Sequence, residues 1–142
     1  MNRVVVTGIG LITALGTGIE KSWKRIVAGE TGVGRIESYD ATDMPVQIAA
    51  EVKDFDPIEF GIEKKEVLAR NTQFAIAATK MALEDSKLVI DETNAEEVGV
   101  IVSSGIGGIE IFEAQHQTML EKGVKRISPF TIPAMIANMA SG

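Results

Sequence analysis

The sequence of 142 residues contains no cysteine and a single histidine. The lack of cysteine excludes disulfides, cysteine-ligated metals and a thiol nucleophile within these residues. No apolar run approaches the roughly 20 residues that span a membrane. The start MNRVVVTG shows no signal-peptide pattern, so we expect a cytoplasmic protein. Lys and Arg number 14 against 20 Asp and Glu, a net charge of −6, which argues against a nucleic-acid partner.

The lone His116 falls among the apolar positions Ile109, Phe112 and Met119 of a helical pattern. A histidine in such a place is more often packed and hydrogen-bonded than catalytic. No second histidine, HExxH motif or spaced carboxylate cluster accompanies it, so we expect no metal site. We assign no catalytic residue and expect no cofactor.

Hydrophobic residues make up 45% of the chain, enough to contribute a sizeable core. The apolar runs 3–7 and 98–102 predict two buried strands. The alternation of apolar and polar residues over 46–52 predicts a third, half-exposed strand. Fully apolar strands need cover on both faces, and few helices here provide it.

Helical spacing predicts the remaining elements. Thr17 and Glu20 form a capping box that opens a first helix. An alanine-rich helix from about Arg70 to Ser86 and a helix between Gly108 and Gly123 follow, and Pro133 fits the first position of a last helix. The alternating order predicts an α/β layered fold with a largely parallel sheet, as one unit over 1–142. The last helix has no C-terminal cap signal and no following strand, so the unit is expected to be incomplete.

The run VVVTGIG invites a dinucleotide-binding interpretation. Gly8 and Gly10 match the G-x-G-x-x-G fingerprint, but Thr13 stands where its third glycine belongs. The alternative is a strand-to-loop turn that uses glycine for tight backbone packing. A nucleotide-binding α/β domain therefore remains an alternative.

A second glycine-rich turn leaves bare backbone on either side of Ile106, through Gly105, Gly107 and Gly108. No Gly-Lys-Ser/Thr follows, so a phosphate cradle is not indicated. Such a turn either lines a narrow apolar pocket or packs Ile106 into the core. The later run 128–133, SPFTIP, is a rigid apolar loop on its residues alone.

Three motifs together resemble the β-ketoacyl-acyl-carrier-protein synthases, most closely the synthase II group. They are V-V-V-T-G-x-G at the start, G-x-G-G in the turn and I-S-P-F-x-I-P near the end, and the resemblance runs from Arg3 to Gly142. It implies that 1–142 forms most of the first α/β half of a thiolase-like layered fold, without the catalytic cysteine. The parent would be an acyltransferase of fatty-acid biosynthesis that performs a decarboxylative Claisen condensation without cofactor or metal. The chain by itself is expected to be inactive.

The resemblance also implies site residues and partners. Ile106 would be a gate at the acyl pocket, and Phe130 would help close the pocket of the partner subunit in a homodimer. The implied substrate-binding residues are Gly105, Ile106, Gly107, Gly108, Phe130 and Ile132. Basic residues would meet an acidic acyl carrier protein, and those implied are Lys64, Lys65, Lys125 and Arg126. The first basic pair matches the family pattern only partly, because Val67, Ala69 and Asn71 depart from it. A non-catalytic relative of the chain-length-factor kind remains an alternative.

Overall fold

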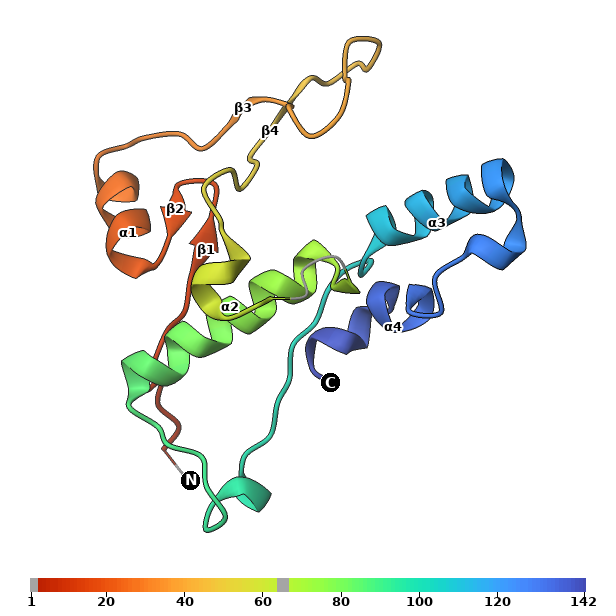
Figure 1. The fold of residues 1–142 in the computed structure, drawn as a ribbon. Coiled ribbons are helices and arrows are strands. Elements are labelled where there is room, and N and C mark those ends of the chain that lie inside the picture. The colour runs from red at the N-terminus through yellow and green to blue at the C-terminus, as the bar shows by residue number, and fades with distance from the viewer. Residues whose placement is uncertain (1–2, 64–66) are drawn as a thin grey trace.

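A computed structural model describes residues 3–63 and 67–142 (Figure 1). The predicted docking residues Lys64 and Lys65 lie outside the described residues. The longer elements are the helices α1 (Ile19–Val27), α2 (Arg70–Ser86), α3 (Ile109–Lys122) and α4 (Thr131–Met135). The short 3-10 helices are η1 (Pro57–Phe60), η3 (Ala95–Glu97), η4 (Val124–Arg126) and η5 (Ala137–Ala140). The strands are β1 (Ile12–Thr13), β2 (Gly16–Thr17), β3 (Gly34–Arg35) and β4 (Ile48–Ala49).

Two of the helices, α2 and α3, form where their patterns predict them. Helix α2 has the predicted bounds, and α3 fills the interval between Gly108 and Gly123. The predicted capping box at the start of α1 is wrong, because Gly18 is the N-cap and no side chain caps the helix. The Thr17 hydroxyl instead donates to the backbone carbonyl of Asp54, at 3.4 Å. The Thr17 hydroxyl therefore makes a contact far away in sequence and not the local capping bond.

The two apolar runs predicted as buried strands are extended but unpaired. Over 3–7 and 98–102 the structure has no strand, and the side chains of Val4 and Ile101 are 93% and 96% exposed. The strands of the described residues form two antiparallel pairs, β1 with β2 and β3 with β4, each two residues long. The predicted half-exposed strand shrinks to Ile48–Ala49. The parallel sheet is therefore absent from the described residues, because an extended segment needs a neighbouring backbone to become a strand.

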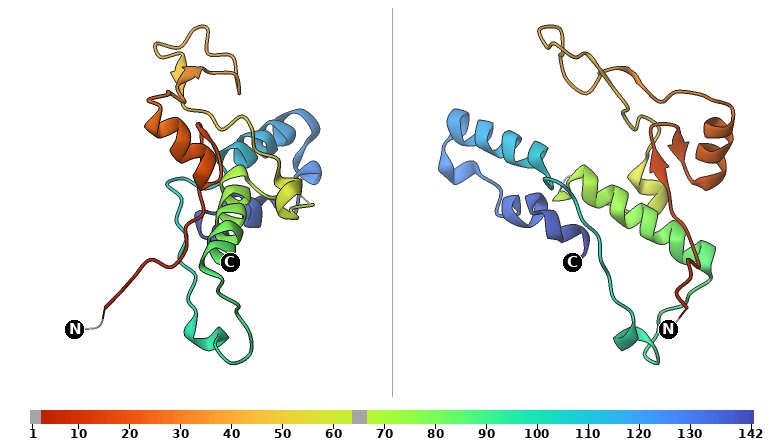
Figure 2. Two further views of the ribbon diagram at one scale, coloured as in Figure 1. Left: turned by 90° about the vertical axis from the view of Figure 1, so that its left-hand side faces the viewer. Right: turned by 180° about the vertical axis from the view of Figure 1, so that it is seen from behind.

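The N-terminal segment meets helix α2 at Gly8 to Gly10, and the described residues before them project away from the helix (Figure 2). A Cβ atom at Gly8 would overlap the carbonyl oxygen of Ala82, and one at Gly10 would overlap that of Ala78. Residues two apart share one face of an extended chain, so both glycines present bare backbone to the helix. The backbone N–H of Ile9 donates to the Asp85 carboxylate at 2.9 Å. These glycines serve close backbone packing, as one of the two readings of this motif predicted.

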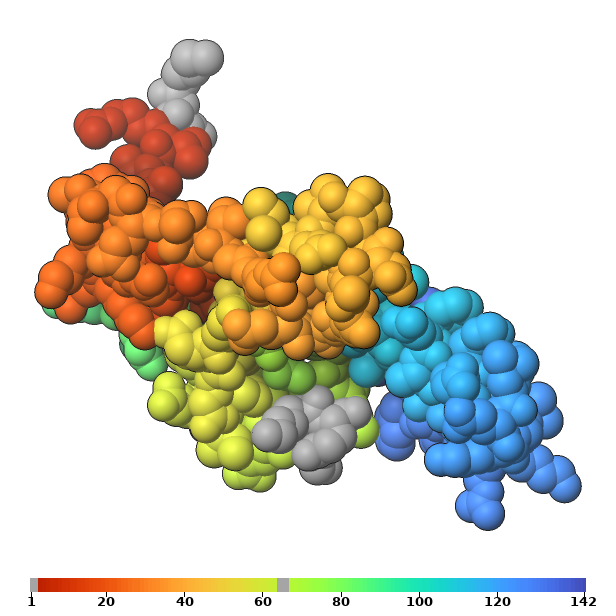
Figure 3. Space-filling model, turned by 90° about the horizontal axis from the view of Figure 1, so that it is seen from above, coloured from red at the N-terminus to blue at the C-terminus, as the bar shows by residue number. Residues whose placement is uncertain are grey.

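The core is small and contains mostly small side chains. Its buried apolar residues are Ala41, Phe55, Ile62, Ala69, Ala77 and Ala134. The ring of Phe55 packs edge-on against Phe74 of α2, with centroids 4.9 Å apart. Helices α3 and α4 project as an arm from one end of the molecule (Figure 3). Many large apolar side chains outside this core are exposed, among them Trp23 at 63%. Among the described residues no helix is long and apolar enough to cross a membrane.

Candidate functional site

The glycine-rich turn lies where the extended run 98–102 meets helix α3, and hydrogen bonds fix it at three levels. Before the turn, the Ser141 hydroxyl accepts from the N–H of Val102 at 2.9 Å and donates to its carbonyl at 2.8 Å. Within the turn, the N–H of Gly107 donates to the Ser104 hydroxyl at 2.9 Å. After it, the N–H of Gly108 donates to the carbonyl of Met135 at 2.8 Å. The turn is thus held against α4 and the C-terminal residues.

Glycine is required at the end of this turn for two reasons. Gly107 has φ of +84°, and a Cβ there would overlap the carbonyl oxygen of Met135. A Cβ at Gly108 would lie 2.5 Å from the Cβ of Ala69 and 2.9 Å from the carbonyl oxygen of Ala134. By contrast, nothing lies within 4 Å of a Cβ built at Gly105. The backbone therefore needs the last two glycines to reach α4.

Ile106 is the only residue of 105–108 that is not glycine. It is 72% exposed, so it does not pack into the core formed by the described residues. A well-held backbone that presents a bulky apolar side chain to open space fits a residue placed to contact something else. The role of Ile106 as a gate to an acyl pocket stays a prediction.

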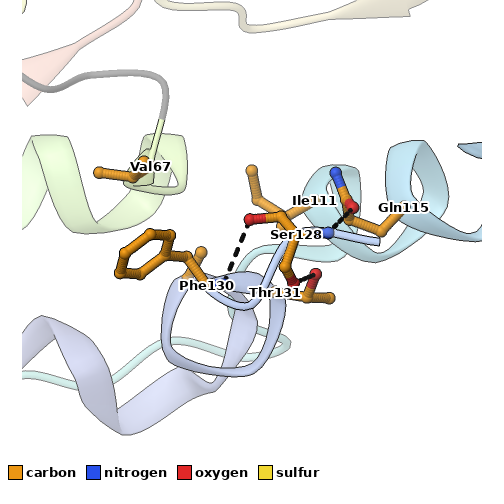
Figure 4. A pocket seen from close by; sticks show the side chains of 7 residues that line it. Val67, Ile111, Gln115, Ser128, Phe130 and Thr131 are labelled. Carbon is orange, nitrogen blue, oxygen red and sulfur yellow. Dashed lines mark hydrogen bonds between the residues drawn. The ribbon is translucent and has the colours of Figure 1, made fainter. Parts of the chain in front are cut away.

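The run 128–133 is organised by Ser128. Its hydroxyl accepts from the N–H of Phe130 at 3.2 Å, its carbonyl accepts from the Thr131 hydroxyl at 2.6 Å, and its N–H donates to the Gln115 side chain at 2.8 Å (Figure 4). These bonds start α4 at Thr131, so Pro133 is its third residue and the prediction that it would be the first is wrong. The third N–H of a helix also lacks an intrahelical partner, which is why proline fits there.

A small pocket of about 50 Å³ opens beside this turn and draws its walls from three parts of the chain (Figure 4). The lining residues are Val67, Ile111, Gln115, Ser128, Phe130, Thr131 and Ala134. Phe130 and Ile132 are 57% and 61% exposed, and only the first of them lines the pocket. The structure thus brings Phe130 close to α3, and it joins the glycine turn to α4 through Met135. The predicted roles of Phe130 and Ile132 stay predictions.

The basic residues Lys125 and Arg126 form most of η4, at the far end of the arm. Both are exposed, and within residues 3–63 and 67–142 neither joins an ion pair. Two adjacent free cations suit an acidic partner. Their docking role stays a prediction.

His116 is exposed rather than packed, which corrects the expectation for it. Its ring stacks on Phe112 with centroids 6.1 Å apart and planes 2° from parallel. Both rings line an apolar groove of about 250 Å³ on α3, together with Met119 and Ile127. Within the described part of the chain, no group of three or more His, Cys, Asp or Glu side chains is placed to hold a metal ion.

The dinucleotide reading of the first glycine motif is not supported by the geometry. The backbone at Gly8 and Gly10 is covered by α2, so no pyrophosphate has room to approach it. The next helix, α1, begins only at Ile19, well beyond the motif. A dinucleotide site needs the glycines at a helix N-terminus.

Sequence reasoning missed several residues that position the site. Ser104 and Ser141 hold the glycine turn, and Glu110 accepts from the N–H of Arg70 at 2.9 Å, which caps α2. The Arg70 guanidinium lies over the Phe74 ring, 4.9 Å from its centroid. Ser104 directly precedes the glycine motif, so its position in the sequence could have indicated its role. The pairing of Ser141 with Val102, 39 residues away, has no local sequence pattern that predicts it.

Hydrogen bonds lower the pKa of carboxylates elsewhere in the chain. The hydroxyl of Ser38 and the N–H of Glu37 hold the pKa of Glu51 below its ordinary value. The hydrogen bond from Lys21 lowers the pKa of Asp54 in the same sense. The side chain of Glu51, which follows β4, thus bonds to Glu37 and Ser38, which follow β3.

Comparison with known proteins gives a family match over the whole chain. The family model for the "Beta-ketoacyl synthase, N-terminal domain" matches residues 1–142. The chain is 46% identical to 3-oxoacyl-[acyl-carrier-protein] synthase 2 of Synechocystis sp. over 142 residues, which cover 99% of this chain and 34% of the relative.

Two solved structures share the fold. A β-ketoacyl synthase from Burkholderia phymatum superposes with a TM-score of 0.77 at 26% identity, over 99% of this chain and 35% of the other. The ishigamide ketosynthase/chain length factor gives the same TM-score and identity, over 96% of this chain and 34% of the other. The chain therefore spans about a third of the length of the relatives that it matches.

Proposed function

The chain belongs to the β-ketoacyl synthase N-terminal domain family, and from this premise we propose that it is part of a 3-oxoacyl-acyl-carrier-protein synthase. The parent protein would join an acyl group to a malonyl unit with loss of CO₂, in fatty-acid elongation. The observation that carries the proposal is the family match over the whole chain. It is supported by a rigidly held glycine turn with the exposed Ile106 at its tip.

In this proposal the chain contributes binding surfaces and another part of the protein contributes the nucleophile, because these 142 residues contain no cysteine. A cysteine thiolate elsewhere would take the acyl group and release the carrier thiol. Loss of CO₂ from the malonyl thioester would leave a carbanion, which attacks the acyl-cysteine carbonyl and returns the thiolate. Backbone N–H groups would stabilise the intermediate oxyanion.

The turn of Gly105, Ile106, Gly107 and Gly108 would then line the acyl pocket, with Phe130 and Ile132 contributed across a homodimer interface. The support is the apolar, exposed arm of α3 and α4, where Phe112, Phe130 and Ile132 are each about half exposed. The exposed pair Lys125 and Arg126 would receive the acidic carrier protein, for which the Synechocystis relative is named. Lys64 and Lys65 belong to the same docking proposal on the resemblance alone, as does a cytoplasmic location.

The test uses the longer protein that carries this chain. Purified with acyl- and malonyl-carrier protein, it should form 3-oxoacyl product, and an alkylating reagent that blocks cysteine should abolish this activity. Ile106→Phe should lower turnover of long acyl primers more than that of short ones, because a larger side chain fills the pocket mouth. Val89→Phe is the matched control, since Val89 is equally exposed at 72% and lies in a loop after α2. Absence of product would refute the proposal.

A non-catalytic role of the chain-length-factor kind is the second candidate. It is favoured by the likeness to the ishigamide ketosynthase/chain length factor. In that case the longer protein would form no acyl-enzyme when incubated alone with acyl-carrier protein. It would support product formation only when a cysteine-bearing ketosynthase is added.

A further inference from the structure

The hydroxyl of Ser141 takes the place of a neighbouring strand. It accepts from the N–H of Val102 and donates to the carbonyl of the same residue, at 2.9 and 2.8 Å. A serine hydroxyl has one donor and two acceptor sites, so a single side chain satisfies both backbone groups. The run 98–102 has no strand partner among the described residues, and this contact fixes it just before the glycine turn.

Ser104 acts on the other side of Ile106. Its hydroxyl accepts from the N–H of Gly107 at 2.9 Å and closes the turn around Gly105 and Ile106. Ser104 and Ser141 are both partly buried, and they hold the chain on the two sides of Ile106: Ser141 holds Val102 before it, and Ser104 holds Gly107 directly after it. We call these two residues the serine clamp.

The position of Ile106 depends on its backbone more than on its own packing. Its side chain is 72% exposed, so few contacts of its own hold it in place. The exit of the turn is already fixed through Gly108 and Met135. The entrance and the middle are fixed by the serine clamp, and removing one hydroxyl leaves backbone groups free to move.

We propose that Ser104 and Ser141 are positioning residues that set where Ile106 stands, and through it the acyl-chain length that the enzyme accepts. This inference rests on the proposed function, in which Ile106 gates the acyl pocket. Neither serine touches the reacting atoms in this proposal. Each acts by holding the backbone that carries the gate.

The experiment measures kcat/KM for a long and a short acyl primer in the longer protein that carries this chain. Ser104→Ala should change the long-to-short ratio by about threefold to tenfold, which is the effect of one neutral hydrogen bond. Ser141→Ala should change it in the same direction by less, because it lies further from Ile106. Ser104→Thr keeps the hydroxyl and should restore the wild-type ratio. Ser103→Ala is the matched control, because its exposed side chain makes no hydrogen bond in the described part of the chain.

The outcomes separate this inference from the proposed function. If Ile106→Phe shifts the ratio while both serine-to-alanine variants leave it unchanged, the gate stands and the serine clamp is refuted. If Ile106→Phe has no effect on the ratio, the gate itself fails and the inference fails with it. A Ser104→Ala protein that does not fold leaves Ser141→Ala to decide. Equal loss for both primers in the serine variants indicates a purely structural role and refutes the inference.

Discussion

Helix α2 and the extended run 98–102 satisfy their backbones in different ways. The interior N–H groups of α2 bond to carbonyls of the same helix, so its 17 residues need neighbours only at the ends and along one face. In the extended run, a single serine hydroxyl bonds both backbone groups of Val102, while Val100 and Ile101 are 57% and 96% exposed. An element that closes its own hydrogen bonds forms from local sequence, whereas an extended run depends on what lies beside it.

Amide hydrogen exchange should show the largest difference between these two regions. In this chain the amides of Val100 and Ile101 are expected to exchange about a thousandfold faster than that of Ala77 inside α2. In the proposed longer protein the difference should shrink, because a neighbouring strand would pair the backbone of Val100 and Ile101 while Ser141 keeps its contact with Val102. Mass-spectrometric or NMR exchange measures both. Equal protection of the two regions in this chain would break the comparison.

Adding one methyl group where the N-terminal segment contacts α2 should lower the stability of the protein strongly. Gly10→Ala would place a Cβ against the carbonyl of Ala78 and is expected to lower the free energy of unfolding by about 2–3 kcal/mol. Gly34→Ala is the control, because nothing lies within 4 Å of a Cβ built there. Urea unfolding of the two variants measures the difference. A Gly10→Ala protein as stable as Gly34→Ala would mean that the segment does not pack on the helix.

The N-terminus of α2 depends on a residue of another helix, Glu110, for one of its backbone hydrogen bonds. Glu110→Ala removes the carboxylate that accepts from the N–H of Arg70, and it should cost about 1 kcal/mol of stability. Glu113→Ala, one turn further along the exposed face of α3, should change stability little because its carboxylate accepts no hydrogen bond within the described residues. Thermal unfolding decides between them. A cost shared equally by both variants would show that net charge, and not the cap, sets the effect.

The smallest effect is expected at the β3–β4 pair. There the carboxylate of Glu51, which follows β4, accepts hydrogen bonds from residues that follow β3. Hydrogen bonds from Ser38 and Glu37 hold the pKa of Glu51 below its ordinary value. A lowered pKa in the folded state gives stability that is present above the unfolded pKa and is lost as the pH falls through the folded one. Ser38→Ala should raise the pKa of Glu51 toward its ordinary value, as seen by NMR titration of the carboxyl carbon. An unchanged pKa would show that the hydroxyl is not the cause.

Much of the helical structure and the fold class was predictable from the sequence. The bounds of α2 and the position of α3 follow from spacing and from the flanking glycines, and the structure confirms them. The motif-based resemblance predicted a thiolase-like fold, which the family match and the solved structures confirm. The parallel sheet was predicted wrongly for these residues, because the strand pattern says which residues prefer to be extended but not whether a partner is present.

The candidate site was predictable only in part. The glycine motif identified the turn, yet two of the three contacts that hold it come from distant residues: Ser141, 39 residues beyond Val102, and Met135. The first capping box failed because the Thr17 hydroxyl found the Asp54 carbonyl, 37 residues away. Such pairings carry no local pattern, since two polar groups meet only after the helices have packed.

The sequence alone determined the family, the absence of a thiol nucleophile within these residues, and the helices, because motifs, composition and 3.6-residue spacing are local properties of the chain. Only the tertiary structure decided which backbone groups found partners. It placed Gly8 and Gly10 against α2, closed the turn around Ile106 with the serine clamp, and left Ile101 almost fully exposed. The physical reason is that an extended backbone and a bare glycine turn take their hydrogen bonds from residues far away in sequence.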